Sequence, residues 1–218
     1  MTKGEIPSPE KQRVVSARLG IKFNRLFWPV DRLAVIEILE KLNYKDIENT
    51  NNQLIEASKS NVDFYWDYNR IILGFRTRKF DAAITAQKEF FSVVKRDFRT
   101  NLADFIKFYE AEYVSDYFTE KEAHGAFSSL YSDSSSLSEF ENIIGLPIRA
   151  AGINLVSREG ETDDSKWYSI DIEPKIESAN NTYFCRIVYR NNSPETVYSI
   201  ARKCPEIVDK IVSNLERK

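Results

Sequence analysis

The sequence is poor in the residues that most catalytic and metal sites use. Among 218 residues there are one histidine, two cysteines and seven glycines. His124 has no cysteine or serine partner at a spacing typical of nucleophilic catalysis, and we expect it at a helix end or in a loop. One histidine and two distant cysteines cannot supply a zinc site of thiolates and imidazoles. The glycines are dispersed, which argues against a phosphate-binding loop and against the common nucleotide-dependent enzymes.

Long apolar runs are also absent. No stretch approaches the roughly 20 apolar residues that span a bilayer, and the polar start MTKGEIPSPEKQ lacks the layout of a signal peptide. We therefore expect a cytoplasmic protein without a membrane segment or a cofactor. Cys185 and Cys204 fall in apolar patterns, which favours buried free thiols, with a disulfide between them as the alternative.

What the chain does contain is enough apolar material for a full core and an uneven distribution of charge. Hydrophobic residues make up 42% of the sequence and aromatic residues 13%. Residues 1–100 hold 18 lysines and arginines against 13 acidic residues, a net charge of +5, whereas residues 101–218 carry −7. This asymmetry favours head-to-tail self-association or a basic face for an acidic partner, and argues against strong attraction of the whole molecule to nucleic acid. Scattered solubilising charge is the plain alternative.

Periodicity predicts the elements of the first half of the chain. Apolar and polar residues alternate over residues 13–25, as in a strand with one buried face. Pro29 and Asp31 open a helix whose apolar residues recur three and four positions apart. The following elements are a loop at KDIENTNN, strands at about 53–58, 62–68 and 70–77 with a tight turn at Tyr68-Asn69, and a helix at about 81–98.

The second half repeats this order less clearly. Residues 104–118 fit both a strand and a helix, and helical material over 120–144 is interrupted by the serine-rich SDSSSLSE. Strands are predicted at about 147–157, 166–173 and 182–190. A helical stretch over 194–216 carries one continuous apolar stripe, and Pro205 kinks or splits it.

Together these patterns predict an α+β fold, a curved antiparallel sheet of about eight strands with helices on one face. A flexible arm at 1–12 precedes two halves, 13–100 and 101–218, packed as one globular unit. Each half follows the order strand, helix, three strands, helix, which suggests an internal duplication and favours the strand at 104–118. In element order this arrangement resembles the TATA-binding-protein architecture. No motif of that family is visible, the acidic second half departs from its basic character, and fold analogy carries no function.

The stretch DFYWDYNRIILGFRTRKF, residues 63–80, combines aromatic rings with cations. Alternation places most of its rings on a buried sheet face and leaves Tyr65 as the one candidate for an exposed platform. With Arg76, Arg78 and Lys79, Tyr65 forms the candidate binding surface. Single-stranded nucleic acid is the less favoured partner, because stacking needs several exposed rings and the aspartates beside Tyr65 would repel phosphates.

The favoured hypothesis is therefore a non-catalytic interaction module that holds a protein partner or a second copy of itself. One alternative is a small-molecule carrier with a cavity between the sheet and the C-terminal helix, lined by rings such as Trp167 and Tyr183. The other is a phosphoesterase that uses Mg²⁺ or Mn²⁺. Its candidate ligands are Asp171 and Glu173, which share one strand face, with Glu110 and Glu112 joining them from a neighbouring strand.

Overall fold

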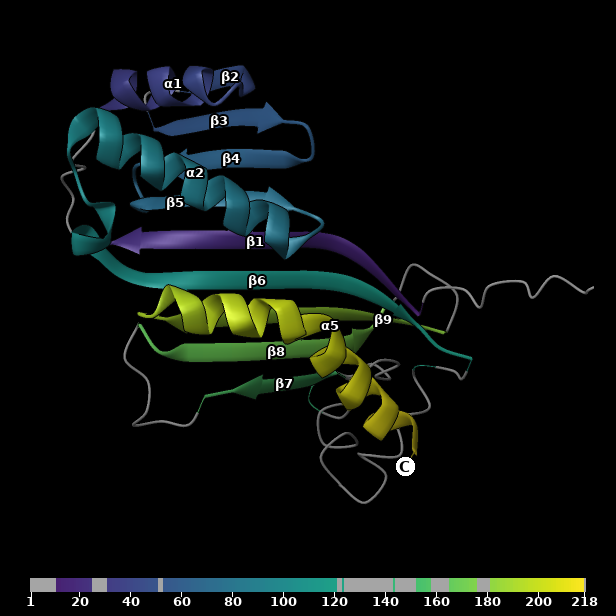
Figure 1. Ribbon diagram of the computed structural model, residues 1–218. Helices are drawn as coiled ribbons and strands as arrows, with labels where there is room; N and C mark the ends of the chain where they lie inside the picture. The colour runs from purple at the N-terminus through teal and green to yellow at the C-terminus, as the bar shows by residue number, and fades with distance from the viewer. Residues whose placement is uncertain are drawn as a thin grey trace, which may run out of the picture.

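A nine-stranded antiparallel sheet runs through the molecule in the order β2-β3-β4-β5-β1-β6-β9-β8-β7 (Figure 1). The computed structural model describes residues 11–24, 31–50, 53–120, 123, 143, 152–157, 165–175 and 181–217. The strands are β1 (Gln12–Phe23), β2 (Lys45–Thr50), β3 (Leu54–Lys59), β4 (Val62–Asp67), β5 (Ile72–Thr77), β6 (Ile106–Phe118), β7 (Ile153–Val156), β8 (Trp167–Pro174) and β9 (Thr182–Asn191). Helices α1 (Arg32–Lys41), α2 (Phe80–Phe98) and α5 (Pro194–Arg217) and the 3₁₀ turn η1 (Leu102–Phe105) complete the described elements.

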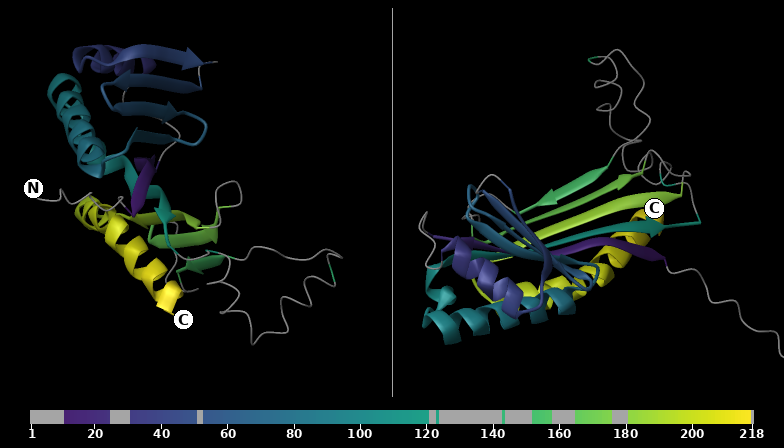
Figure 2. Two further views of the ribbon diagram at one scale, coloured as in Figure 1. Left: turned by 90° about the vertical axis from the view of Figure 1, so that its right-hand side faces the viewer. Right: turned by 90° about the horizontal axis from the view of Figure 1, so that it is seen from above.

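The three helices lie on the same side of the curved sheet, as the view from above in Figure 2 shows. The predicted α+β fold, with a curved antiparallel sheet and helices on one face, is thus confirmed. Strands β1 and β6 are neighbours at the centre, and the later strands of each part of the chain extend outward from them. That the two parts are related by duplication stays a prediction.

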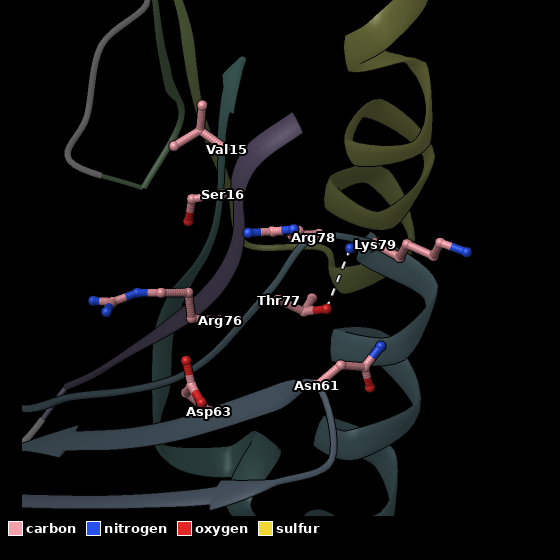
Figure 3. A pocket seen from close by; sticks show the side chains of 8 residues that line it. All are labelled: Val15, Ser16, Asn61, Asp63, Arg76, Thr77, Arg78 and Lys79. Carbon is pink, nitrogen blue, oxygen red and sulfur yellow. Dashed lines mark hydrogen bonds between the residues drawn. The ribbon is translucent and has the colours of Figure 1, made fainter. Parts of the chain in front are cut away.

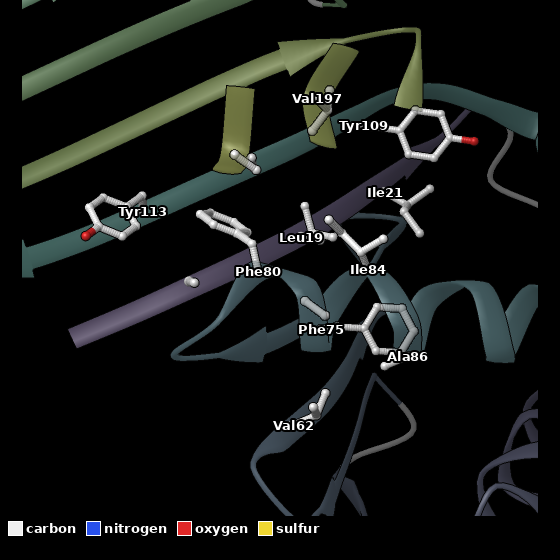
Figure 4. Close-up of a cluster of buried hydrophobic side chains, with 14 of the residues drawn as sticks. Leu19, Ile21, Val62, Phe75, Phe80, Ile84, Ala86, Tyr109, Tyr113 and Val197 are labelled. Atoms are coloured by element: carbon white, nitrogen blue, oxygen red, sulfur yellow. The ribbon is translucent and has the colours of Figure 1, made fainter. Parts of the chain in front are cut away.

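The core fills the space between the sheet and the helices. On β1, Leu19 and Ile21 point toward the helices and are almost fully buried, and on β6 Tyr109 and Tyr113 do the same. The alternating pattern of β1 is the reason, since it gives that strand one apolar and one polar face. Figure 4 shows these side chains meeting Phe75, Phe80, Ile84 and Val197 from the neighbouring strand and helices.

The segment KDIENTNN was predicted as a loop, but its first six residues form the edge strand β2. The sheet therefore has nine strands where about eight were predicted, and the additional strand belongs to the first part of the chain. Lys45, Asp46 and Glu48 give β2 no apolar alternation, because its backbone pairs with β3 while most of its side chains stay exposed. Charged edge strands of this kind discourage pairing with other chains.

The ambiguous stretch at 104–118 is a strand, as the repeated element order favoured. Strand β6 pairs with β1 on one side and β9 on the other, so its backbone lies in the middle of the sheet. The helical spacing at Leu102 and Phe105 belongs to the 3₁₀ turn η1 that precedes the strand. Sequence periodicity could not distinguish a helix from a strand here, because the 3₁₀ turn η1 runs directly into strand β6.

The predicted turn between β4 and β5 differs in detail. Asn69 was expected to hold the left-handed backbone, but Ile71 does so, with φ 54°. This is an unusual conformation for a β-branched residue. The amide of Phe23 on β1 donates to the Ile71 carbonyl at 3.2 Å, and the Ile71 side chain packs against the core. Both contacts hold Ile71 in place.

Helix α5 is a principal core element, and its predicted apolar stripe is buried at Val197, Ala201, Cys204, Val208, Val212 and Leu215. Pro205 lies inside the helix, which Figure 1 shows bending partway along its length. A proline there removes a helical hydrogen bond and favours a bend. The side chain of Gln12 donates to the Pro205 carbonyl at 2.7 Å and fixes the start of β1 to the bend.

Both cysteines are buried and free, as favoured from the sequence. Burial raises the pKa of each thiol to about 12, so neither forms a reactive thiolate at neutral pH.

Several sequence predictions fall on residues that the structure does not describe. They are the arm before Lys11, His124, the serine-rich segment 132–139 and the first part of the strand predicted at 147–157. None of the helices in the described ranges combines the length and the apolar character that a bilayer crossing requires.

Candidate binding surface

The candidate site lies on the open face, the side of the sheet opposite α1, α2 and α5. No helix of the described residues covers this face (Figure 2). Antiparallel pairing aligns its side chains in rows across the strands. The central row is Glu56, Tyr65, Gly74, Gly20, Glu110, Arg190 and Trp167. The row beside it contains Ser58, Asp63, Arg76, Arg18, Glu112 and Val188.

Tyr65 is half-buried, because its ring lies across the sheet over a glycine. A Cβ at Gly74 would be 2.2 Å from the Tyr65 hydroxyl oxygen, and one at Gly20 would be 3.5 Å from it. The ring centre is 5.8 Å from the Arg18 guanidinium and 5.9 Å from that of Arg76, within cation–π range. Burial raises the pKa of Tyr65 to about 12, despite the opposing effect of Arg18. Tyr65 is therefore a packed spacer between two arginines.

Two glutamates and three arginines form a charge network at the centre of the open face. Glu110 accepts hydrogen bonds from Arg18 and Arg190, each at 2.6 Å. Glu112 lies 2.9 Å from Arg18 and 2.7 Å from Arg186. Each carboxylate thus bridges two cations that come from different strands. The network ties together β1, β6 and β9.

The four carboxylates of the metal hypothesis share the open face, as their alternation predicted. The oxygens of Glu110 and Glu112 are paired with arginines. Asp171 accepts a hydrogen bond from Asn154 and lies 3.9 Å from Arg186. Glu173 lies exposed, two positions further along β8. Within the described residues there is no group of three or more side chains suited to holding a metal ion. The arrangement favours a charge network over a metal centre.

The rings of the carrier hypothesis lie on opposite faces of the sheet. Trp167 flanks Arg190 on the open face, 4.9 Å from the ring centre to the guanidinium. Tyr183 faces α5 and is fully buried beside Cys185. These two rings cannot line one cavity, and tightly packed side chains occupy the layer around Tyr183.

At the edge of this face, three cations line a pocket of about 430 Å³, here called the basic pocket (Figure 3). They are Arg76, Arg78 and Lys79, and Asp63 is the one carboxylate among the lining residues. Figure 3 shows Arg76 and Arg78 extending toward one side of the pocket and Lys79 toward the other. None of the three forms an ion pair with another described residue.

The basic pocket lies where β5 passes into α2, and the residue that begins this helix is an unfavourable one. Lys79 is the N-cap residue of α2 and has no side-chain hydrogen bond to the helix. Its backbone amide instead donates to the Thr77 hydroxyl at 3.2 Å. Serine, threonine, aspartate and asparagine are the favoured N-caps, and cations at a helix N-terminus oppose the helix dipole.

At the far end of the open face, Asp116 anchors the beginning of β1. Its carboxylate is 1% exposed and accepts hydrogen bonds from Arg13 and Lys175. Burial alone would raise the pKa of Asp116, but these two hydrogen bonds outweigh it and lower that pKa.

The four residues predicted for binding are close together in the structure. Arg76, Arg78 and Lys79 line the basic pocket, and Tyr65 supports Arg76 from the adjoining strand. The charge network was missed, because alternation gives the face of each side chain but not the register that pairs Arg18 with the glutamates of β6. Searches against protein-family models and against curated protein sequences find no match.

Proposed function

We propose that this protein is a non-catalytic binding module that holds an acidic protein segment at the basic pocket. One observation carries the proposal. Arg18, Arg186 and Arg190 on the open face are each neutralised by a carboxylate. The cations of the basic pocket are exposed and unpaired among the described residues, although the same sheet pairs its other arginines.

The position of these cations supports the same conclusion. Lys79 at the N-cap and Arg78 just before it each oppose the helix dipole by an amount on the order of 0.3–1 kcal/mol, and Asp81 is the one acidic residue of the first turn that acts in the opposite sense. Sequences that depart from local structural preference do so most often at functional sites. Because Arg78 and Lys79 do not stabilise the start of the helix, their presence there supports a role in binding.

The test compares the wild type with the variant Arg76→Glu/Arg78→Glu/Lys79→Glu, using a fluorescent oligoglutamate peptide and anisotropy at low salt. We expect a roughly tenfold or greater loss of affinity, because each exposed pairing contributes about 0.2–1 kcal/mol and about 1.4 kcal/mol is a tenfold change. Moderate salt should weaken wild-type binding as well. Unchanged affinity in the variant would refute the proposal.

A matched control changes three exposed lysines of the helical layer, Lys88, Lys95 and Lys203, to glutamate. It alters the net charge by the same amount at a distance from the pocket, so binding should remain. Equal loss in both variants would show that the peptide responds only to the charge of the whole molecule. Lys79→Asp serves as a folding control, since an aspartate N-cap stabilises α2 by about 1 kcal/mol while removing a pocket cation.

A further inference from the structure

A second, acidic pocket adjoins the basic pocket. It has a volume of about 240 Å³ and is lined by the carboxylates of Asp46, Glu48, Glu56 and Asp63 and by Arg76. Asp63 and Arg76 line both pockets, so the two form one groove on the open face. We call it the bipolar groove: Arg78 and Lys79 mark its basic end, and β2 and β3 supply its acidic end.

Within the part of the chain that the structure describes, neither end of the bipolar groove is neutralised by an ion pair. Asp46 accepts a hydrogen bond from the Ser58 hydroxyl at 3.2 Å, but none of the four carboxylates forms an ion pair with another described residue. Asp63 stands directly opposite Arg76 in the register of β4 and β5 without pairing with it. The Arg76 guanidinium lies over the Tyr65 ring instead. The groove therefore presents unpaired charges of both signs, with the opposite signs separated along its length.

An occupant of uniform charge would match only one end of the groove and would face like charge at the other. A matching occupant carries both signs at the same separation. A second copy of this chain carries both signs at that separation, and a two-fold axis that crosses the groove at right angles brings the basic end of each groove onto the acidic end of the other. Resting on the proposed binding role of the basic pocket, we infer that the bipolar groove is a self-complementary interface that joins two copies of this chain face to face.

Two variants reverse one end of the groove each. Arg78→Glu/Lys79→Glu makes both ends acidic, and Asp46→Lys/Glu48→Lys/Glu56→Lys makes both ends basic, since only Asp63 then remains among the four carboxylates. In the two-fold arrangement each variant repels itself, but a mixture restores attraction at both ends. Lys95→Glu/Lys203→Glu on the helical layer matches the charge change of the first variant and is the control.

The measurement is sedimentation equilibrium at several protein concentrations in low and moderate salt, with circular dichroism to confirm folding. We expect a salt-sensitive wild-type dimer, a roughly tenfold or larger rise in the dissociation constant for each groove variant, and an equimolar mixture of the two that pairs as a heterodimer. The control variant should dimerise like the wild type.

Three results would overturn the inference. They are a wild type that stays monomeric at every concentration, groove variants that dimerise as well as the wild type, and a mixture that does not pair. A monomeric wild type that still binds oligoglutamate at the basic pocket would leave the proposed function standing and remove only the second copy as partner.

Discussion

Substituting Gly74 by alanine should destabilise the protein, although alanine ordinarily suits a strand better than glycine. The added Cβ would be 2.2 Å from the Tyr65 hydroxyl oxygen and 2.3 Å from the ring carbon that bears it. Both distances are too short for a van der Waals contact, so the Tyr65 ring must move. Backbone need not move, because the far end of a side chain on the open face can swing away. The cost is therefore set by the contacts that the ring loses.

The structure allows that cost to be worked out. The ring gives up two cation–π contacts, with Arg18 and Arg76, each contributing about 0.5–1 kcal/mol at partly exposed sites. Replacing a glycine in a strand by alanine stabilises the folded state by about 0.5–1 kcal/mol. The net loss is then about 0.5–1 kcal/mol in the wild-type background. In a Tyr65→Ala background nothing obstructs the new methyl group, and the same substitution should stabilise by about 0.5–1 kcal/mol.

The assay is a double-mutant cycle on Gly74→Ala and Tyr65→Ala by urea denaturation, followed by circular dichroism. The expected coupling free energy is about 1–2 kcal/mol, with a change of sign between the two backgrounds. Equal effects of Gly74→Ala with and without the tyrosine would refute the packing of Tyr65 over this glycine.

Three further predictions concern stability. Asp116→Asn should cost about 1–3 kcal/mol at neutral pH. Because the folded pKa of Asp116 lies below its unfolded value, its contribution is present above the unfolded pKa and disappears as the pH falls through the folded one, so the variant should lose less stability than the wild type on acidification. Arg99→Gly at the end of α2, where φ is 52°, should stabilise by about 0.5–1 kcal/mol in urea melts, whereas Lys88→Gly in the same helix should destabilise. Deleting residues 205–218 removes three buried apolar side chains of α5, each contributing about 1.5–3 kcal/mol, and should abolish the cooperative thermal transition; a truncated chain that still melts cooperatively would contradict this.

Sequence periodicity was sufficient for the elements whose burial is one-sided. The alternation in β1, β4 and β8 and the apolar stripe of α5 report directly which face meets the core, and each was predicted correctly. Strand β2 was missed because an exposed edge strand is held by backbone pairing with β3, which leaves no mark on its side chains. The position of Ile71 in the turn was missed for a similar reason, since tertiary contacts there override the local preference of asparagine.

The candidate site was predictable in part. Composition and adjacency in sequence identified Arg76, Arg78 and Lys79, because these residues are neighbours along one strand end. The acidic end of the groove could not be found in this way, since Glu48 and Glu56 come from strands whose pairing is set by the sheet as a whole. The ion pairs of Glu110 with Arg18 and Arg190 could not be predicted either. These residues are far apart in the sequence, and only the register of β6 with β1 and β9 brings them together.

Tyr65 connects the fold of the sheet to the proposed interface. Its ring occupies the space that Gly74 leaves open, and it supports the guanidinium of Arg76, which lies at the junction of the basic and acidic pockets. Displacing the ring with Gly74→Ala would therefore remove the platform under Arg76 without changing any charge. If the bipolar groove joins two copies, this neutral substitution should weaken the dimer in sedimentation equilibrium. A dimer as tight as that of the wild type, in a variant shown to have lost the ring contacts, would mean that the position of Arg76 does not matter and that net charge alone drives association.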